Sequence, residues 1–336
     1  MKRSVFGVDI AKEIFQVHWV DTQTGEIHSE RVKRSKFLTF FSNREAALIA
    51  MEACGGSHHW ARQLKAMGHE VRLLAGHKVK PFVVGNKNDM VDAKAIWTAV
   101  QQPGMRFVAI KSEEQQAVLG LHRMREQLVK FRTAQINAVR GLLTEFGVVM
   151  PKSRSAFHAK VAESLAEIAE QVPAFFIESL RERVAHIRKL DDDIKALERQ
   201  LQQWFKSNEQ SQRIAKIPGI GVLSATALVA TIGDAKQFKH GRELAAWLGL
   251  VPKQTGSGGR VKLHGISKRG DTYVRTLLIH GARAVLTHCK QPNSWLQSLL
   301  SRRPKNVVLA AQANKMARVV WALLAHETEY KANPHA

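Results

Sequence analysis

Residues 4–10, Ser-Val-Phe-Gly-Val-Asp-Ile, decide how the first third of this 336-residue chain folds. Apolar side chains dominate the stretch and predict a buried β-strand, with Asp9 near its end. A carboxylate in an apolar strand needs a partner, because burying an isolated charge is costly. The strand offers no obvious basic neighbour on the same face. Asp9 is therefore the first candidate functional residue.

The segments that follow predict a sheet of the ribonuclease H type. The elements expected in chain order are strands at 15–20 and 27–32, a short helix at 35–42, a strand at 46–53, a helix at 59–67 and a strand at 70–74. A turn at Thr24-Gly25 joins two of these strands, so the first three strands form successive antiparallel hairpins. The fourth strand ends in Glu52. Sites in open sheets gather at the carboxyl ends of strands, where Asp9 and Glu52 both stand.

A second pair of acids lies in Gly85–Ala95, Gly-Asn-Lys-Asn-Asp-Met-Val-Asp-Ala-Lys-Ala. The Gly and Asn residues predict a loop, which contains Asn86. Residues 91–100 predict a helix after it, and either Asp89 or Asn88 can cap that helix. Asp89 and Asp92 are three positions apart, so their carboxylates share one helix face.

Two carboxylates that close repel each other unless a cation lies between them. Mg²⁺ or Mn²⁺ shared by Asp9, Glu52, Asp89 and Asp92 would satisfy all four acids, since both ions prefer hard oxygen ligands. The alternative is ordinary. Asp89 then caps the helix, Asp92 is solvated, and the two strand acids face water.

Two long helices are predicted in the middle of the chain. The first spans residues 112–147 and opens with the capping-box pattern Ser112-x-x-Gln115. Its apolar positions recur at three and four, and they are Ala117, Leu121, Met124, Leu128 and Phe131.

The second long helix spans residues 174–205. Its apolar seam is Ile177, Leu180, Val184, Ile187, Leu190, Ile194, Leu197, Leu201 and Trp204. This spacing predicts a coiled coil, in which the two helices pair antiparallel within one chain or between chains. Residues 151–155 form the polar break between them, and the acidic run 191–193 is expected on a solvated face without chemistry.

The C-terminal third contains a candidate DNA-binding turn, Ile217-Pro218-Gly219-Ile220-Gly221, between two apolar segments. It resembles a helix-hairpin-helix, in which Gly219 and Gly221 let backbone N–H groups approach a DNA phosphate at a helix N-terminus. A tight interhelical turn without a ligand is the alternative.

A glycine-rich segment around Ser257 follows. Cations surround it at Arg260, Lys262, Lys268, Arg269 and Arg275. By composition the segment is an anion-binding loop, in which the hydroxyl of Ser257 helps to bind phosphate rather than reacting.

The charge of the chain favours a polyanionic partner. The formal net charge is +22, and residues 210–336 carry 19 Lys and Arg against 5 Asp and Glu. Nucleic acid is the commonest such partner, and no long basic amphipathic helix favours a membrane surface. Two cysteines are too few for a disulfide framework or a thiolate zinc site, which fits a reducing cytoplasm. We expect neither an export signal nor a membrane span, since no run of 18 apolar residues occurs.

Seven motifs together carry a family resemblance. They are Phe6-Gly7-Val8-Asp9, Met51-Glu52-Ala53-Cys54-Gly55, Asn88-Asp89-Met90-Val91-Asp92-Ala93, Ile217-Pro218-Gly219-Ile220-Gly221, Gly249-Leu250-Val251-Pro252, Ser257-Gly258-Gly259-Arg260 and Gly265-Ile266-Ser267-Lys268-Arg269-Gly270-Asp271. In this order they resemble insertion-sequence family one-ten, the acidic-tetrad transposases also called bridge-RNA-guided recombinases, and the second subgroup most closely. The departure is Cys54, where many members have Thr or Ser.

The resemblance implies an α/β plus α fold with three domains. These are a RuvC-like catalytic domain (1–108), a coiled-coil region (109–208) and a mainly helical transposase domain (209–330). It also implies that Asp9, Glu52, Asp89 and Asp92 hold Mg²⁺, and that Ser257 attacks the scissile phosphate to form a phosphoserine link. Donor and target DNA, a non-coding guide RNA, and a homodimer or homotetramer are the implied partners.

Two other functions compete with a site-specific recombinase. A metal-dependent nuclease or junction resolvase would use the same acids, with Ser257 only binding phosphate, and would form no covalent protein–DNA adduct. A non-catalytic nucleic-acid scaffold would use the acids as helix caps, and would show no metal-dependent cleavage.

Overall fold

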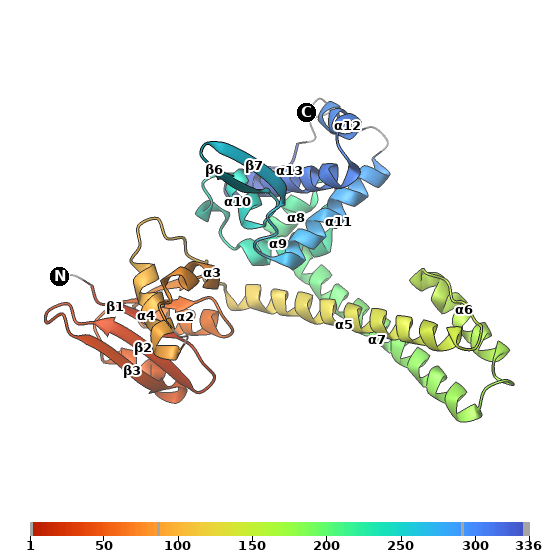
Figure 1. The fold of residues 1–336 in the computed structure, drawn as a ribbon, viewed down its shortest axis with the longest axis horizontal. Helices are drawn as coiled ribbons and strands as arrows, with labels where there is room; N and C mark the ends of the chain where they lie inside the picture. The colour runs from red at the N-terminus through yellow and green to blue at the C-terminus, as the bar shows by residue number, and fades with distance from the viewer. Residues whose placement is uncertain (1–2, 86–87, 290–291, 332–336) are drawn as a thin grey trace. The chain divides into compact units, whose positions relative to one another are not determined.

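A computed structural model describes residues 3–85, 88–289 and 292–331 of the chain (Figure 1). Two compact units divide it, residues 1–114 and 115–336. The predicted second and third domains thus lie almost entirely within one unit, while the division into three domains stays a prediction. Asn86, in the predicted loop, lies outside the described residues.

The first unit is built on a five-stranded mixed sheet. Its strands are β1 (Val5–Asp9), β2 (Ile14–Val20), β3 (Ile27–Lys33), β4 (Leu48–Glu52) and β5 (Glu70–Leu74). They lie in the order β3-β2-β1-β4-β5, with β1, β2 and β3 antiparallel and with β4 and β5 parallel to β1. The predicted α/β sheet is confirmed, and its arrangement is consistent with a ribonuclease H-like fold.

Helices cover both faces of this sheet. They are α1 (Phe37–Ser42) with η1 (Arg34–Lys36) before it, α2 (Ser57–Ala66), α3 (Gly76–Val79) with η2 (Lys80–Phe82) after it, and α4 (Asp89–Val100). Side chains alternate along each strand, so Phe6 and Val8 join the core that contains residues of α1 and α2. Residues of β4 and β5 form a separate core with α4.

Gly7 allows α4 to lie directly on β1. A Cβ atom at this position would stand 2.3 Å from the carbonyl oxygen of Ala93, so no larger residue fits. Two residues earlier on the strand, the carbonyl of Val5 accepts a hydrogen bond of 3.0 Å from the indole of Trp97. Gly7, later on the strand, thus contacts Ala93, and Val5, earlier on the strand, contacts Trp97, which comes later on the helix. The helix α4 therefore runs antiparallel to β1.

The second unit is mainly helical. Its helices are α5 (Glu113–Thr144), α6 (Arg154–Glu167), α7 (Ala174–Ser207), α8 (Glu209–Ala215), α9 (Val222–Ile232), η3 (Ala235–Gln237), α10 (Gly241–Trp247), α11 (Thr272–His288), α12 (Ser294–Arg302) and α13 (Lys305–Ala325). The strands β6 (Pro252–Ser257) and β7 (Arg260–Ile266) form a separate hairpin. The helix α6 was not predicted; it begins within the predicted polar break, and its Phe157 and Val161 are fully buried.

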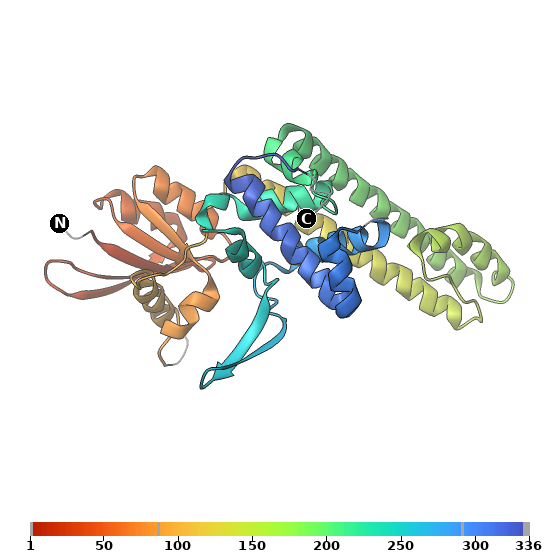
Figure 2. The ribbon, with the colours of Figure 1, turned by 90° about the horizontal axis from the view of Figure 1, so that it is seen from above.

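The helices α5 and α7 run antiparallel within the chain (Figures 1 and 2). Arg125 pairs with Glu198 at 2.7 Å, and Arg132, further along α5, pairs with Asp191, which lies earlier on α7, at 2.8 Å. The predicted seam of α7 is buried or half-buried at every position.

The apolar positions predicted on α5 match its packed face only in part, since Leu121 and Leu128 are half-buried and Ala117 is exposed. Met124 and Phe131 are 48% and 50% exposed, whereas the buried positions of this helix are Val118, His122, Ile136, Val139 and Leu143. The buried face also carries Arg125 and Arg132, which pair with Glu198 and Asp191 of α7, so charged residues interrupt its apolar pattern. Hydrophobic spacing alone therefore did not identify the most buried positions of α5.

Asp191 is not on a solvated face, contrary to expectation. Its side chain is 12% exposed, and its Oδ1 accepts hydrogen bonds from Arg132 at 2.8 Å and Arg154 at 2.7 Å. His158 lies 2.8 Å from Oδ2. This one carboxylate thus joins α5, α6 and α7.

Among the described residues, one helix, α13, is long and apolar enough to cross a membrane by length and composition. Its residues Val308, Ala313, Met316 and Val320 are buried, and most of them belong to the main core of the second unit. A core position accounts for the apolar composition of α13.

Candidate active site and nucleic-acid surface

Asp9 and Glu52 end two adjacent parallel strands on the same face of the sheet. Val8 of β1 is in register with Met51 of β4, so the next residues, Asp9 and Glu52, are neighbours. Side chains alternate, and Val8 and Met51 lie in the core shared with α1 and α2. Both acids therefore lie on the opposite face, which α4 covers.

The first turn of α4 carries the other two acids to the same edge. Because α4 runs antiparallel to β1, its N-terminal end lies toward the carboxyl end of that strand, where Asp9 stands. The side chain of Asn88 accepts a hydrogen bond of 2.9 Å from the backbone N–H of Val91 and caps the helix. Asp89, which is exposed, and Asp92, which is half-buried, thus lie in this first turn without serving as the cap.

The charges of Asp9 and Glu52 act on a common neighbour. Burial raises the pKa of the Cys54 thiol, and the negative charges of Glu52 and then Asp9 raise it further. Glu52 also lies against Gly76, where a Cβ atom would stand 2.6 Å from its Oε1. A larger residue at position 76 would have to displace the end of the Glu52 side chain.

Four carboxylates at one edge fit a divalent cation by their chemistry. All are hard oxygen donors, and within the described part of the chain no Lys, Arg or His forms an ion pair with Glu52, Asp89 or Asp92. The described residues contain no group of three or more Asp, Glu, His or Cys close enough to hold a metal ion. The acids thus share an edge of the sheet rather than a coordination sphere.

Ser257 stands at the tip of a hairpin, not in a loop as expected. Gly258 and Gly259 form its two-residue turn with φ angles of +56° and +77°, which glycine adopts without strain. Every residue of β6 is exposed, and the hairpin extends from the helices in Figure 2. Ser257 is therefore accessible to solvent.

Cross-strand pairing gives this hairpin two different faces. Ser257 pairs with Arg260 and Thr255 pairs with Lys262, so these four side chains share one polar and cationic face. On the other face lie Val261 and Leu263, 60% and 65% exposed. The serine therefore has a guanidinium as its direct neighbour across the strands.

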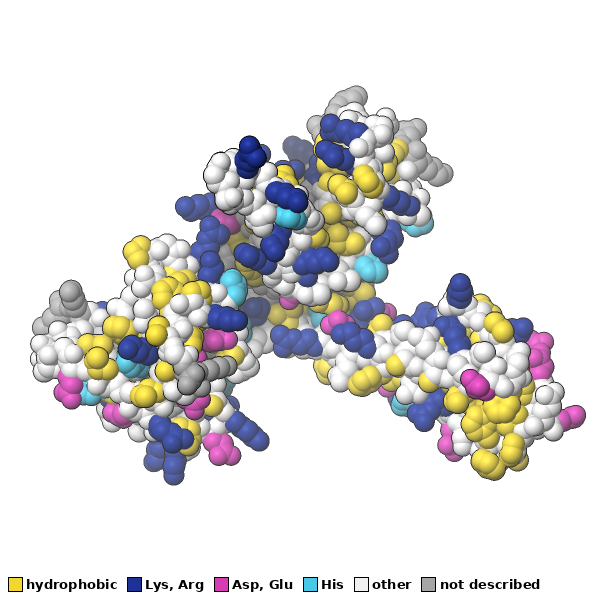
Figure 3. All heavy atoms as spheres, in the orientation of Figure 1, with side chains coloured by type: hydrophobic (Ala, Val, Ile, Leu, Met, Phe, Trp, Pro, Cys, Tyr) yellow, Lys and Arg dark blue, Asp and Glu magenta, His cyan; other side chains and the backbone are white. Residues whose placement is uncertain are grey.

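Lys268 and Arg269 lie at the base of the hairpin with exposed side chains. Two glycines let the backbones cross here, since a Cβ at Gly249 would stand 2.0 Å from the carbonyl oxygen of Arg269, and one at Gly270 would stand 2.0 Å from that of Trp247. Lys268 itself adopts a φ of +55°, and its N–H donates to Gly249. The base is thus held by backbone contacts. Figure 3 shows Lys and Arg side chains over this part of the molecule.

Arg275 does not belong to the cationic surface predicted around Ser257. It is 8% exposed, and its guanidinium donates to the carbonyls of Leu248 and Arg269 and to the hydroxyl of Thr272. These bonds hold the segment after β7 against the end of α10. The role of Arg275 is structural.

The two glycines of the helix-hairpin-helix-like turn have different surroundings. Gly219 has a φ of +86°, and a Cβ there would lie 2.6 Å from the carbonyl oxygen of Gly281 in α11. Close packing against α11 therefore accounts for Gly219 without any ligand. Gly221 is exposed at the N-terminus of α9, where backbone N–H groups point outward. Of the pair, Gly221 is the one open to a phosphate.

The buried residue His122 on α5 was not among the residues predicted from the sequence. Its side chain is 1% exposed and lies 2.9 Å from the Tyr273 hydroxyl and 3.0 Å from Thr226 Oγ1. Burial, together with the charge of Arg125, lowers the pKa of His122 to about 4. A neutral imidazole thus links α5 to α9 and α11. Its position one helical turn after the apolar Val118 was the signal in the sequence that His122 lies on the buried face of α5.

Comparisons with known proteins place the chain among transposases. The profile described as "Transposase IS116/IS110/IS902 family" matches residues 211–297, and one described as "Transposase" matches residues 6–148. A probable family 20 transposase of Pseudomonas aeruginosa is 48% identical, over 98% of this chain and 99% of its own. The transposase for insertion sequence element IS1111A of Coxiella burnetii is 41% identical, over 97% of this chain and 91% of its own. The transposase for insertion sequence element IS1328 of Yersinia enterocolitica is 35% identical, over 97% of this chain and 98% of its own.

Proposed function

The chain belongs to the IS116/IS110/IS902 family of insertion-sequence transposases, and we propose that it cleaves and exchanges DNA strands through a covalent phosphoserine link at Ser257. As a transposase it is an enzyme of phosphodiester transesterification that acts on DNA. We assign catalysis by the acids to residues 1–108, assembly to 109–208, and the serine to 209–330, and we place the reaction in the cytoplasm.

The neighbour of Ser257 carries the proposal. Arg260 stands opposite it across the hairpin, so the guanidinium and the hydroxyl can meet the same phosphate. Arginine holds phosphate oxygens with paired donors, and it remains charged at any physiological pH. Because the tip is exposed, a duplex can reach the hydroxyl. This arrangement supports a nucleophile better than a buried serine would.

The proposed chemistry needs no external energy source. The Ser257 Oγ–H gives its proton to solvent as Oγ bonds to phosphorus, and the DNA oxygen on the far side of the phosphate leaves and takes up a proton from solvent. A DNA hydroxyl from the exchange partner then attacks the phosphoserine, reseals the strand and releases Ser257. The energy of the phosphodiester bond is conserved throughout, whereas attack by water would only cut.

We propose that Asp9, Glu52, Asp89 and Asp92 hold Mg²⁺ or Mn²⁺. When bound, such an ion neutralises charge on the reacting phosphate and stabilises the leaving oxygen. The support is that the four acids gather at one edge, from β1, β4 and the first turn of α4, while Asn88 takes over the capping. Their mutual repulsion gives a cation a reason to bind there.

Further partners are proposed from the remaining surfaces. The basic residues 210–336 suit both DNA and a non-coding guide RNA, with Arg260, Lys262, Lys268, Arg269 and Gly221 as contacts to the phosphate backbone. The exposed α5 stripe that contains Met124 and Phe131 has heptad spacing and supports a homodimer or homotetramer. Gly219 is not among these contacts, because its role is to let the turn pack closely against α11.

The decisive experiment looks for a covalent adduct. Wild type and Ser257→Ala are incubated with labelled DNA substrate and Mg²⁺, quenched in denaturant and run on a protein gel. We expect label to migrate with wild type but not with Ser257→Ala. Thr255→Ala, which removes a hydroxyl from the same hairpin face, is the matched control and should keep the adduct. Asp89→Asn should abolish cleavage while leaving DNA binding intact.

The runner-up is a metal-dependent nuclease or junction resolvase in which Ser257 only binds phosphate. In that case Ser257→Ala should slow cleavage by about 1–2 kcal/mol, or roughly tenfold to thirtyfold. Wild-type cleavage without any labelled protein would establish this alternative and overturn the serine assignment.

A further inference from the structure

Acidic residues are rare in the C-terminal third, and their uses differ. Three of the five accept hydrogen bonds from backbone N–H groups and so serve local structure, namely Asp234, Glu243 and Asp271. The other two, Glu327 and Glu329, lie in residues 326–331 after α13. We call these six residues the C-terminal strap. Its acids face cationic side chains instead.

The strap acids contact cations near the α8–α9 turn. The Glu329 carboxylate accepts a hydrogen bond from the Lys216 ammonium, at the start of the turn, and lies 3.7 Å from Nε of Arg213 on α8. Glu327 lies 3.4 Å from the Lys236 ammonium on η3, just beyond α9. Three cations around the candidate DNA-binding turn are thus paired with the strap.

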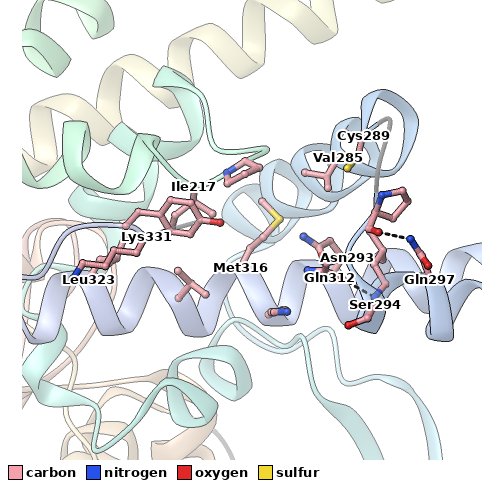
Figure 4. Close-up of a pocket in the computed structure, with 16 residues that line it drawn as sticks. Ile217, Val285, Cys289, Asn293, Ser294, Gln297, Gln312, Met316, Leu323 and Lys331 are labelled. Carbon is pink, nitrogen blue, oxygen red and sulfur yellow. Dashed lines mark hydrogen bonds between the residues drawn. The ribbon is translucent and has the colours of Figure 1, made fainter. Parts of the chain in front are cut away.

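The strap is anchored by aromatic contacts at both ends. Tyr330 packs against the core of the second unit, and the His326 ring lies 5.1 Å from that of Trp321. Lys331 and Ile217 line one pocket of about 920 Å³ (Figure 4), so the strap borders the turn itself. The ion pairs, by contrast, are partly exposed, and exposed pairs are weak. An anion of higher charge can therefore replace the carboxylates.

We infer that Arg213, Lys216 and Lys236 form a contact surface for the phosphate backbone of duplex DNA, and that the strap covers this surface by presenting carboxylates in place of phosphates. The inference rests on the proposed function, since it takes DNA as the substrate. Its basis is charge and position. The surface flanks Gly221 and the open N-terminus of α9, where backbone N–H groups suit a phosphate.

Neutralising the strap tests the inference. The variant Glu327→Gln with Glu329→Gln keeps side-chain shape and removes both charges. Its affinity for a short duplex DNA of arbitrary sequence, measured by fluorescence anisotropy, should rise about threefold to thirtyfold, as expected for several weak pairs released together. The control Glu178→Gln with Glu182→Gln removes two exposed acids from α7 and matches the change in net charge. It should raise affinity much less.

A second measurement separates masking from a general gain in charge. If the strap covers Lys216, then Lys216→Ala should weaken DNA binding more in the strap-neutral variant than in the otherwise wild-type protein. An equal loss in both backgrounds, or equal tightening by the α7 control, would overturn the inference. So would tightening seen with duplex RNA but not with duplex DNA. The adduct assay tests the proposed function separately. If wild type forms the adduct but the strap-neutral variant binds DNA with unchanged affinity, only the inference about the strap is refuted. If the affinity changes but wild type forms no adduct, only the assignment of Ser257 as nucleophile is refuted.

Discussion

Acidification should destabilise the second unit through His122. In the folded chain the buried imidazole is neutral, and its pKa is lowered to about 4, mainly by burial. In the unfolded chain the same group titrates near 6.5, so between that pH and about 4 the imidazole is protonated in the unfolded state and neutral in the folded state. The stability that depends on neutral His122 is complete above pH 6.5 and declines as pH falls toward 4.

The size of this effect follows from the two pKa values. A difference of about 2.5 units corresponds to about 3 kcal/mol at full titration, and about 2 kcal/mol of it should be lost by pH 5. His122→Gln removes the titration while leaving a neutral, polar side chain near Tyr273 and Thr226. The variant should be less stable at pH 7.5, because hydrogen bonds and packing are lost. Its disadvantage should shrink by about 2 kcal/mol between pH 7.5 and pH 5.

Urea unfolding followed by far-UV circular dichroism measures this difference. The free energy of unfolding of wild type minus that of His122→Gln is compared at both pH values, so other titrations cancel. His186→Gln, which replaces an exposed histidine on α7, controls for loss of one imidazole. A difference between wild type and His122→Gln that stays constant with pH would refute the burial of a neutral imidazole between α5, α9 and α11.

Two further predictions concern the base of the hairpin. Gly249→Ala should destabilise the second unit by at least about 1–3 kcal/mol in urea unfolding, because of its φ of +71° and its contact with the Arg269 carbonyl, whereas Gly265→Ala, which meets open space, should be nearly neutral. Replacing Lys268 and Arg269 with Ala should lower the log–log salt slope of DNA binding by about 0.7 to 0.9 for each lost phosphate contact, and an unchanged slope would mean that both side chains face away from DNA.

The sequence predicted the first unit well because its signals are local and consistent. Alternating or continuous apolar runs gave all five strands, and β5 was predicted at its observed bounds. The order of strands and helices then placed Asp9 and Glu52 at strand ends. The same signals could not show how α4 approaches β1, which depends on Gly7 and on the Trp97 bond to Val5.

The errors arose where polar groups are buried. On α5, hydrophobic spacing selected Met124 and Phe131, because the packed face contains His122 and arginines whose partners lie on other helices. Asp191 looked solvated for the same reason, since its partners on α5 and α6 are distant in sequence. Arg275 was grouped with the phosphate-binding cations, although it holds carbonyls in the interior. Charge in a sequence does not reveal whether tertiary partners will neutralise it.

The position of Ser257 suggests that DNA helps to order the reacting groups. A catalytic group must be held to within about 0.5 Å, which usually requires packing around it. The hairpin is fixed at its base by the crossing at Gly249 and Gly270, yet β6 is exposed along its whole length and the tip has only the cross-strand pair with Arg260. A phosphate held by Arg260 supplies a contact that the hairpin tip otherwise lacks. We therefore infer that Arg260→Ala impairs adduct formation more than it weakens overall DNA binding, since the surface carries many other cations but Ser257 has only this neighbour across the strands.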